Sequence, residues 1–542
     1  MVTDSVSASM SVVSVSVVLV LFDSAIFFTF LVTCWSSFDN GDPGLSKIVG
    51  TRILAGFAYT SSQNWVNHGG DLYNRRYAEK ESKIGPETVS RLRKKWEFVA
   101  GKDITATPVI SDGTLYFPSW NGNIYAVNAS DGSLAWEKNL GDLTGLNATG
   151  FNVNVNWTVS RASPTIADDL LIIGIYGPAI VIAVERLSGE LVWSTQLDNH
   201  ATGVITMSGT YYKRKDASLR KSLSKDQVST PFILYGKSKN FYVGTSSQEE
   251  SLSIEQCCTF RGSLAKLDVR TGKVLWQTFT LPDNFGQKAS TPEEVSGEAV
   301  HRSMPLETLS MLAPGICIRL LFVLSSGSVS YLWFFACNNL STPNCPPGQN
   351  PDADFAEAPM ITSIKVNGTK RDIVVAVQKS GFAWALNRDN GGRTWWSRRR
   401  RRSYGYEEGL HQHSQLSIQE FYFETIGNKH DSGWMGAMDD ANSGEILWST
   451  ADPSNSMATG PVTVANGVVF AGSTYKQGPI YAIDAENGRI LWSYETGATV
   501  YGGMSVNDGC VYVCNGYKVN LGAFFPTFSS GTSLFAFCVQ DV

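Results

Sequence analysis

A short sequence pattern recurs along the chain and limits what it can fold into more than any other feature. Each copy has an apolar run, a turn that ends in Gly, and a Trp four residues after that Gly, as from Tyr125 to Trp136 and from Tyr481 to Trp492. The other copies end at Trp193, Trp276, Trp395 and Trp448, and Trp96 closes an isolated copy. Such a period indicates a repeat architecture, because each unit buries its apolar face only against its neighbours.

The units read as antiparallel sheets. Residues 104–140 contain four short runs with period-two alternation, separated by Asp-Gly or Asn-Gly turns, which is typical of hairpins. Four such strands are the content of one propeller blade. A Trp at a fixed distance from a turn Gly can pack flat between adjacent sheets and donate its indole N–H across the gap. We therefore interpret the tryptophans as structural and predict an all-β propeller.

The last strand has no docking Trp of its own. The run from Ser533 to Cys538 resembles the strand that precedes the Gly turn in other units, but no Gly-x-x-x-Trp follows it. We expect it to pair with the segment that ends at Trp96 to Phe98. This pairing of the two ends of the propeller would remove exposed edges that invite aggregation.

Composition fits one large domain, residues 60–542. The chain has 542 residues, of which 43% are hydrophobic and 17% charged, so it can bury a large core. Length alone predicts several domains, but the repeats override that prediction. The formal net charge is -5 and no basic face is evident, so we expect no nucleic-acid partner.

The N-terminal segment resembles a secretory signal. The first 46 residues contain no Lys or Arg, and the apolar run from Val12 to Val32 is interrupted by Asp23. We expect a signal peptide over residues 1–35 rather than a stable membrane span, and hence a secreted, extracellular protein. Five glycosylation sequons are compatible with a secreted glycoprotein: Asn128, Asn147, Asn156, Asn339 and Asn367.

Four of the nine cysteines form two candidate disulfides. Cys337 and Cys345 bracket a short loop, and Cys510 and Cys538 lie on strands expected in the same closing blade. An oxidising compartment would permit both disulfides, with free buried thiols as the alternative for each pair.

Cys257 and Cys258 are adjacent and raise a different possibility. Neighbouring cysteines can bond only through a strained eight-membered ring, which is a stiff, flat element. In an apolar pocket this ring could cover one face of a planar cofactor. The alternative is a pair of inert buried cysteines.

The segment from Asn64 to Ala78, the Gly-x-x-x-Trp repeats and the closing strand together resemble the pyrroloquinoline quinone (PQQ)-dependent alcohol dehydrogenases. The nearest branch is the plant proteins described as polyvinyl-alcohol-dehydrogenase-like. The resemblance covers about residues 60–285, 333–396 and 433–540. It implies an eight-bladed propeller with calcium-bound PQQ near its axis. It also implies hydride transfer from a small or polymeric alcohol to PQQ, and an external electron acceptor.

The resemblance also implies which residues serve the site. Glu249 matches the glutamate that binds calcium, with Glu250 as the alternative, and calcium prefers hard oxygen ligands of this kind. Asp354 takes the place of the catalytic base, with Asp352 as the alternative. Lys379 matches a cation that contacts PQQ and the aspartate and would stabilise the anionic reduced quinone.

Two segments depart from the family pattern. Residues 284–332 lack both the Trp-Gly motif expected under the cofactor and the Thr-Gly-Asn motif expected to supply a calcium ligand. Residues 397–432 carry five arginines, Arg398 to Arg402, which read as a solvated loop rather than a polyanion site. His411 and His413 alternate without further ligands and are a weak metal signal. The departures predict one damaged or missing blade.

Two functions of different classes follow. The first is a secreted PQQ-dependent alcohol dehydrogenase-like quinoprotein. The second is a non-catalytic propeller that binds a protein or glycan on its loops, since a fold alone guarantees no activity. No Cys-x-x-Cys-His occurs, so we expect no covalently attached c-type haem and an electron acceptor outside the chain.

Overall fold

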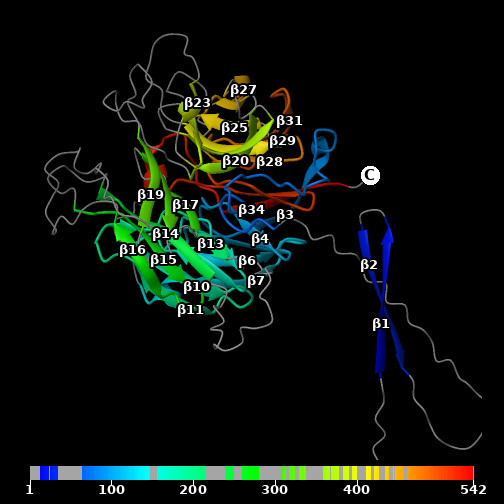
Figure 1. Cartoon of the computed structure of the whole chain (residues 1–542), viewed down its shortest axis with the longest axis horizontal. Coiled ribbons are helices and arrows are strands. Elements are labelled where there is room, and N and C mark those ends of the chain that lie inside the picture. The colour runs from blue at the N-terminus through cyan, green and yellow to red at the C-terminus, as the bar shows by residue number, and fades with distance from the viewer. Residues whose placement is uncertain are drawn as a thin grey trace, which may run out of the picture. The chain divides into compact units, whose positions relative to one another are not determined.

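The computed structural model divides the chain into two compact units, Met1–Ser62 and Gln63–Val542 (Figure 1). In the first unit it describes residues 13–22 and 25–34. In the second unit it describes residues 64–146, 155–213, 239–249, 259–279, 308–312, 317–323, 329–336, 358–366, 368–377, 382–389, 393–398, 410–416, 420–425, 434–438, 444, 446–456 and 460–540.

The first unit is a β-hairpin within the apolar N-terminal run. Strand β1 (Val13–Phe22) pairs antiparallel with β2 (Ala25–Cys34). The ladder runs from Val13 opposite Cys34 to Phe22 opposite Ala25. The signal-peptide interpretation of residues 1–35 stays a prediction.

The second unit is built of antiparallel sheets, as the repeats predict, and six of those described have four strands. The first sheet contains β4 (Val109–Ser111), β5 (Thr114–Pro118), β6 (Asn123–Asn128) and β7 (Leu134–Asn139). The second contains β8 (Thr165–Ala167), β9 (Leu170–Gly174), β10 (Ile180–Glu185) and β11 (Leu191–Gln196). The third sheet contains β20 (Met360–Val366), β21 (Thr369–Val377), β22 (Phe382–Asn387) and β23 (Arg393–Arg398). The fourth contains β24 (Leu410–Leu416), β25 (Glu420–Thr425), β26 (Trp434–Met438) and β27 (Ile446–Ala451). The fifth sheet contains β28 (Thr463–Ala465), β29 (Val468–Gly472), β30 (Pro479–Asp484) and β31 (Ile490–Glu495). The sixth contains β3 (Leu92–Val99), β34 (Ser533–Val539), β33 (Cys510–Cys514) and β32 (Ser505–Asn507).

Two further sheets and three short helical turns complete the described elements. A five-stranded sheet contains β12 (Gly203–Val204), β13 (Thr210–Lys213), β14 (Lys239–Ser247), β15 (Ser263–Asp268) and β16 (Val274–Phe279). A three-stranded sheet contains β17 (Thr308–Leu312), β18 (Cys317–Val323) and β19 (Val329–Ala336). The helical turns are η1 (Val89–Arg91), α1 (Leu140–Thr144) and η4 (Asn520–Phe524).

Neighbouring sheets contact one another through their inner strands in a propeller arrangement. Strand β4 contacts β8 on one side and β32 on the other, and β28 contacts both β32 and β24. Apolar residues of adjacent sheets form shared core clusters; one cluster joins β4–β7, β28–β31 and the β3/β32–β34 sheet. The structure thus confirms an all-β propeller, while the count of eight blades stays a prediction.

The repeated tryptophans bind each sheet to the next. Among those described, four indole N–H groups donate to a backbone carbonyl of the following sheet at 2.9–3.0 Å. The pairs are Trp96 with Ala129, Trp136 with Arg186, Trp193 with Val269, and Trp448 with Ala485. Each acceptor lies three residues before the turn Gly of its own unit. The structural interpretation of these tryptophans is confirmed.

The closing pair forms as predicted. Strand β3 pairs antiparallel with β34, so the first strand of the propeller completes a sheet made by the last three (Figure 1). Cys510 and Cys538 face each other on β33 and β34 and form a disulfide. The sequence-based pairing of these two cysteines is therefore confirmed; Cys337 and Cys345 lie outside the described residues.

The two departing segments differ from each other in the structure. Within residues 284–332 the described part is a three-stranded sheet with β19 as its last strand, in place of a four-stranded one. Within residues 397–432, strand β24 pairs antiparallel with β25, and β25 pairs with β26. The second segment thus contributes two strands to a four-stranded sheet. His411 and His413 lie on β24, and a register shift falls between them.

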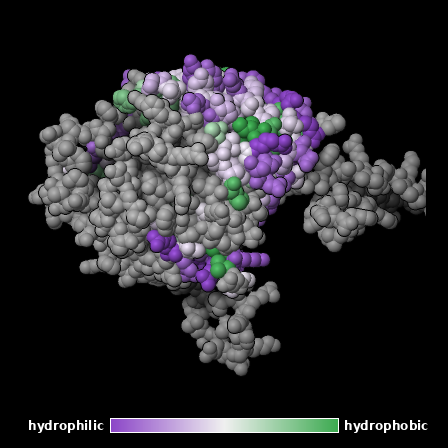
Figure 2. Space-filling view, turned by 90° about the horizontal axis from the view of Figure 1, so that it is seen from above, coloured by the Kyte–Doolittle hydropathy of each residue, from purple (hydrophilic) through white to green (hydrophobic). Residues whose placement is uncertain are grey.

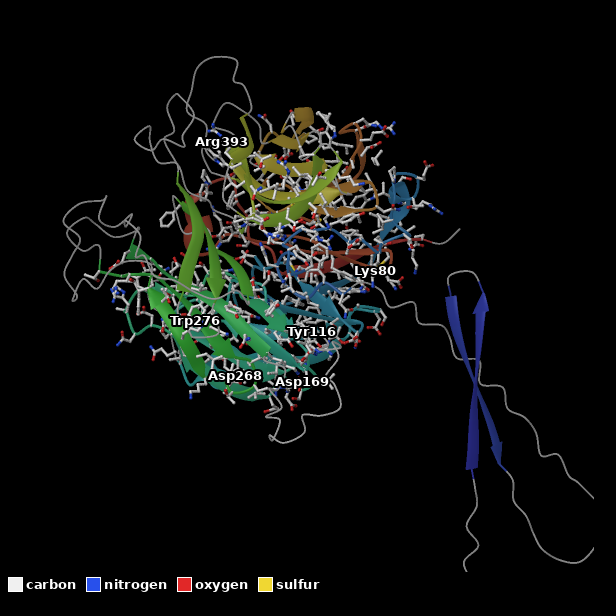
Figure 3. All side chains as sticks on the ribbon, viewed as in Figure 1. Lys80, Tyr116, Asp169, Asp268, Trp276 and Arg393 are labelled. Carbon is white, nitrogen blue, oxygen red and sulfur yellow. A yellow bond between two sulfur atoms is a disulfide. The ribbon has the colours of Figure 1, made fainter. Side chains whose placement is uncertain are left out.

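Trp276 marks the edge at which the docking pattern stops. It lies on β16, opposite Lys266 of β15 (Figure 3). Its indole nitrogen is buried, and no partner for it lies within the described part of the chain. The next segment along the chain is the first departing one, which agrees with the loss of a docking turn there.

The described surface is mostly polar. On the face seen in Figure 2, hydrophilic residues surround small separate apolar spots. The most exposed apolar side chains are scattered, as Leu187, Phe524 and Val99 illustrate. Within the described ranges, no helix has the length and apolar character needed to cross a membrane.

Candidate functional site

Only one of the residues assigned to the site from the sequence lies in the described part of the chain. Glu249 lies two residues after the end of β14 and is 4% exposed. The catalytic candidates Asp354 and Lys379 and the adjacent Cys257 and Cys258 lie outside the described residues. The alternatives Glu250 and Asp352 lie outside them as well.

The structure brings together loops that the sequence separates widely. In each sheet, the chain enters the inner strand and leaves the second strand on the same side, because the two strands are antiparallel and joined by a tight turn. Residues just before β8 and β32 therefore meet residues just after β5, β9, β14 and β33. Aromatic side chains follow three of these second strands, at Trp120, Tyr176 and Tyr517.

These aromatic residues surround an arginine. The Arg161 guanidinium lies 5.8 Å from the ring centre of Tyr176 and 5.9 Å from that of Tyr517. The rings of Tyr501 and Tyr517 are 4.4 Å apart, and those of Trp120 and Tyr176 are 5.6 Å apart. We call these five residues the arginine–aromatic cluster. It has the properties needed to bind a planar anion, since rings supply stacking surfaces and the guanidinium supplies charge.

The charge of Arg161 is secure. Burial acts to lower its pKa, but the electrostatic effect of Tyr517, Tyr501 and Tyr176 outweighs it, so the pKa lies above its ordinary value. Burial also raises the pKa of Tyr517, which keeps that phenol neutral. The cluster therefore carries the positive charge of Arg161.

Glu249 lies close to this cluster but is held by its own loop. Its neighbour Gln248 donates from Nε2 to the Tyr176 hydroxyl at 3.1 Å. The Glu249 carboxylate accepts the Thr259 N–H at 2.9 and 3.1 Å, the Thr259 hydroxyl at 3.0 Å and the Phe260 N–H at 2.9 Å. These contacts satisfy both oxygens and join the end of β14 to the strand that follows.

His200 lies between Glu249 and a pocket. Its Nε2 is 3.4 Å from Glu249 Oε1 and 2.8 Å from the Thr259 hydroxyl, and its Nδ1 lies 3.0 Å from the Thr202 hydroxyl. The pocket has a volume of about 420 Å³. It is lined by Gln196, Leu197, Asp198, Asn199, His200, Thr259, Phe260, Arg261 and Phe279. The pocket mixes amide, carboxylate and aromatic groups, a composition suited to a polar organic ligand.

The described residues fit the implied cofactor better than the implied metal. The arginine–aromatic cluster suits PQQ, which is a planar ring system bearing carboxylates. A calcium ion needs six to eight oxygen ligands, whereas N–H and O–H donors fill the oxygens of Glu249. Within the described residues, no three acidic, His or Cys side chains gather where they could hold a metal. These contacts do not support the predicted metal role of Glu249.

Arg161 and its tyrosines were not predicted from the sequence. Each stands alone in the sequence. Arg161 and Tyr176 flank β8 and β9 of one sheet, whereas Tyr501 and Tyr517 flank β32 and β33 of another. A signal did exist, because an aromatic residue follows the second strand in three units at nearly the same distance. Only the antiparallel arrangement of the inner two strands shows that these positions converge.

Comparisons with known proteins identify the family and support the fold. The family model described as outer membrane protein assembly factor BamB matches residues 89–301 and 432–523. The chain is 24% identical over 517 residues to a polyvinylalcohol dehydrogenase of a Pseudomonas species, covering 84% of this chain and 74% of that protein. A second polyvinylalcohol dehydrogenase, from Sphingopyxis sp. strain 113P3, is 22% identical and covers 84% of this chain and 73% of its own length.

A solved structure shows the same fold. The quinohemoprotein alcohol dehydrogenase from Comamonas testosteroni superposes with a TM-score of 0.61 at 16% sequence identity. The superposition covers 88% of this chain and 80% of that one.

Proposed function

The chain belongs to the PQQ_2 family of repeat propellers, and on that premise we propose that it is a quinoprotein that binds PQQ at the arginine–aromatic cluster and oxidises an alcohol. The resemblance to quinoprotein alcohol dehydrogenases is confirmed, whereas closeness to plant members stays a prediction. The observation that carries the proposal is the position of the cluster: a charged arginine with three tyrosines and a tryptophan, where the loops of several sheets converge.

The cluster would hold and orient the cofactor. Tyr176 and Tyr517 are both 3% exposed, so their rings are fixed by packing and could flank a planar ligand with little loss of side-chain freedom. The Arg161 guanidinium could receive a carboxylate or quinone oxygen. When bound, PQQ supplies the group that accepts hydride from an alcohol.

The proton chemistry is assigned to residues outside the described ranges. We propose Asp354 as the base that accepts the alcohol proton, because a carboxylate near the substrate hydroxyl can hold it. We propose Lys379 as a second cation beside the cofactor, and the Cys257–Cys258 pair as a flat cover over one face of it. The substrate would be a small or polymeric alcohol, and the electron acceptor would be external.

The same proposal includes the finer predictions of architecture and location. We propose an eight-bladed ring in which the three-stranded β17–β19 sheet is the damaged blade. We also propose secretion, directed by residues 1–35, and glycosylation at the sequons.

A second candidate function rests on a specific observation. Within the described residues the indole N–H of Trp276 has no hydrogen-bond acceptor, and the family model leaves out residues 302–431. A propeller with a defect at this edge could serve as a binding scaffold without catalysis.

A binding titration separates the two functions. The purified protein would be titrated with PQQ while its absorbance, tryptophan fluorescence and thermal unfolding are followed. The proposal expects saturable binding, a higher unfolding temperature, and reduction of a dye acceptor with polyvinyl alcohol or a short alcohol. A folded protein that binds no PQQ would refute the quinoprotein function and favour the scaffold.

A further inference from the structure

The environment of Glu249 is built for hydrogen-bond donors rather than for a cation. A carboxylate offers about four lone-pair positions. Thr259 and Phe260 direct two backbone N–H groups and one hydroxyl at these positions, and His200 Nε2 adds a ring nitrogen at 3.4 Å. A metal ion that replaced these donors would face the positive ends of two N–H dipoles. It would also leave two partly buried N–H groups without acceptors, which is costly.

Arg161 offers a positive charge at the same side of the sheets. Gln248, next to Glu249, bonds to Tyr176, and the ring of Tyr176 lies beside the Arg161 guanidinium. No carboxylate of the described chain forms an ion pair with Arg161. Its neighbours are tyrosines, which neither neutralise its charge nor fill the bidentate geometry that a guanidinium presents to an anion.

We propose that PQQ binding in this protein depends on the charge of Arg161 and does not depend on a calcium ion at Glu249. This inference rests on the proposed function and assigns the cationic role of that site. Arg161 compensates the anionic groups of the quinone, while Glu249 holds the loop at Thr259 and Phe260 in place.

The test combines metal removal with single substitutions. PQQ affinity of the wild-type protein would be measured by absorbance and fluorescence, once in excess EDTA and once with added calcium. We expect the same affinity in both. Arg161→Met should weaken binding roughly ten- to hundredfold, because a charged hydrogen bond contributes about 1.5–3 kcal/mol. Arg161→Lys should retain an intermediate affinity.

Two control variants separate charge from folding. Arg270 is another arginine that is well exposed and paired with Asp169, so Arg270→Met should leave PQQ affinity unchanged. Glu249→Gln should lower the unfolding temperature through lost bonds to Thr259 and Phe260, with PQQ affinity in EDTA close to that of the wild type.

Each outcome of these measurements either supports or contradicts the inference. Binding that requires calcium, is lost in Glu249→Gln and is indifferent to Arg161→Met overturns this inference while keeping the quinoprotein function. Absence of PQQ binding under both metal conditions overturns the quinoprotein function itself and the inference with it. If Arg161→Met does not fold, two measurements still test the proposal: the PQQ affinity of the wild type with and without calcium, and the PQQ affinity of Arg161→Lys. A wild-type affinity that is raised by calcium contradicts the proposal.

Discussion

The docking of a tryptophan on a turn glycine can be measured with one matched pair of substitutions. Gly113 and Gly132 lie in two hairpin turns of the same β4–β7 sheet and have nearly the same φ, +77° and +76°. A Cβ on Gly113 would meet nothing within 4 Å. A Cβ on Gly132 would lie 2.8 Å from two ring atoms of Trp96. The pair therefore differs in packing and not in backbone conformation.

The expected losses follow from these distances. Placing alanine in the left-handed region costs about 1–2 kcal/mol, and this is the whole cost expected for Gly113→Ala. Gly132→Ala adds an overpacking cost of about 1–3 kcal/mol, because the Trp96 ring is fixed by its N–H bond to Ala129 and cannot move away. The total for Gly132→Ala is roughly 2–5 kcal/mol.

Urea unfolding followed by tryptophan fluorescence would compare the two variants with the wild type. Gly132→Ala should lower the transition midpoint clearly more than Gly113→Ala. Combining Gly132→Ala with Trp96→Phe should cost less than the sum of the two single changes, because the smaller ring leaves room for the methyl group. Equal losses for the two alanine variants would refute the docking argument.

Three further predictions concern other contacts. Lysines and Tyr211 around Asp168 lower the pKa of its carboxyl to about 2 despite the opposing effect of burial. The ionised carboxylate therefore stabilises the folded state above about pH 4, and this stabilisation is lost as the pH falls through about 2. Asp168→Asn should lower the free energy of unfolding by roughly 1–2 kcal/mol at pH 7 but by little at about pH 2. Urea unfolding midpoints measured at both pH values would show this difference. Replacing Cys510 and Cys538 with Ala should lower the free energy of unfolding by about 2–4 kcal/mol, and a reductant should lower the unfolding temperature of the wild type but not of the variant. Trp193→Phe should destabilise by about 1–3 kcal/mol more than Trp276→Phe, since only the first indole has a described acceptor; similar losses in thermal unfolding would contradict this.

The sequence predicts the fold well because the decisive features are local. A Gly-x-x-x-Trp turn can be recognised from a few consecutive residues. The absence of this turn after Ser533 to Cys538 predicts a partner strand elsewhere in the chain, and the pairing of β3 with β34 confirms that prediction. The disulfide followed from the same reasoning, since two strands of one blade bring their cysteines together. Residues 397–432 were harder, because Leu410–Leu416 and Glu420–Thr425 show no clear alternation of apolar and polar residues, although both segments form strands.

The site is less predictable than the fold. Glu249 was identified through the resemblance, and the structure shows that it is buried. Its hydrogen bonds to Thr259 and Phe260 could not be foreseen, because they depend on how two loop segments approach each other. Arg161 belongs to no recognised sequence motif. Its environment is formed by tyrosines that are distant from it in the sequence.

The pairing of β3 with β34 also has a consequence for how the protein is made. Ser533 on β34 donates to Glu97 on β3 across 436 residues of chain. At 5–20 residues per second, β3 leaves the ribosome roughly 20 to 90 seconds before its partner strand exists. During that time Trp96 can already dock on Ala129, only 33 residues away, so the β4–β7 sheet can shelter β3 from other nascent chains. The tryptophan that joins two finished blades thus also protects an unfinished one during translation.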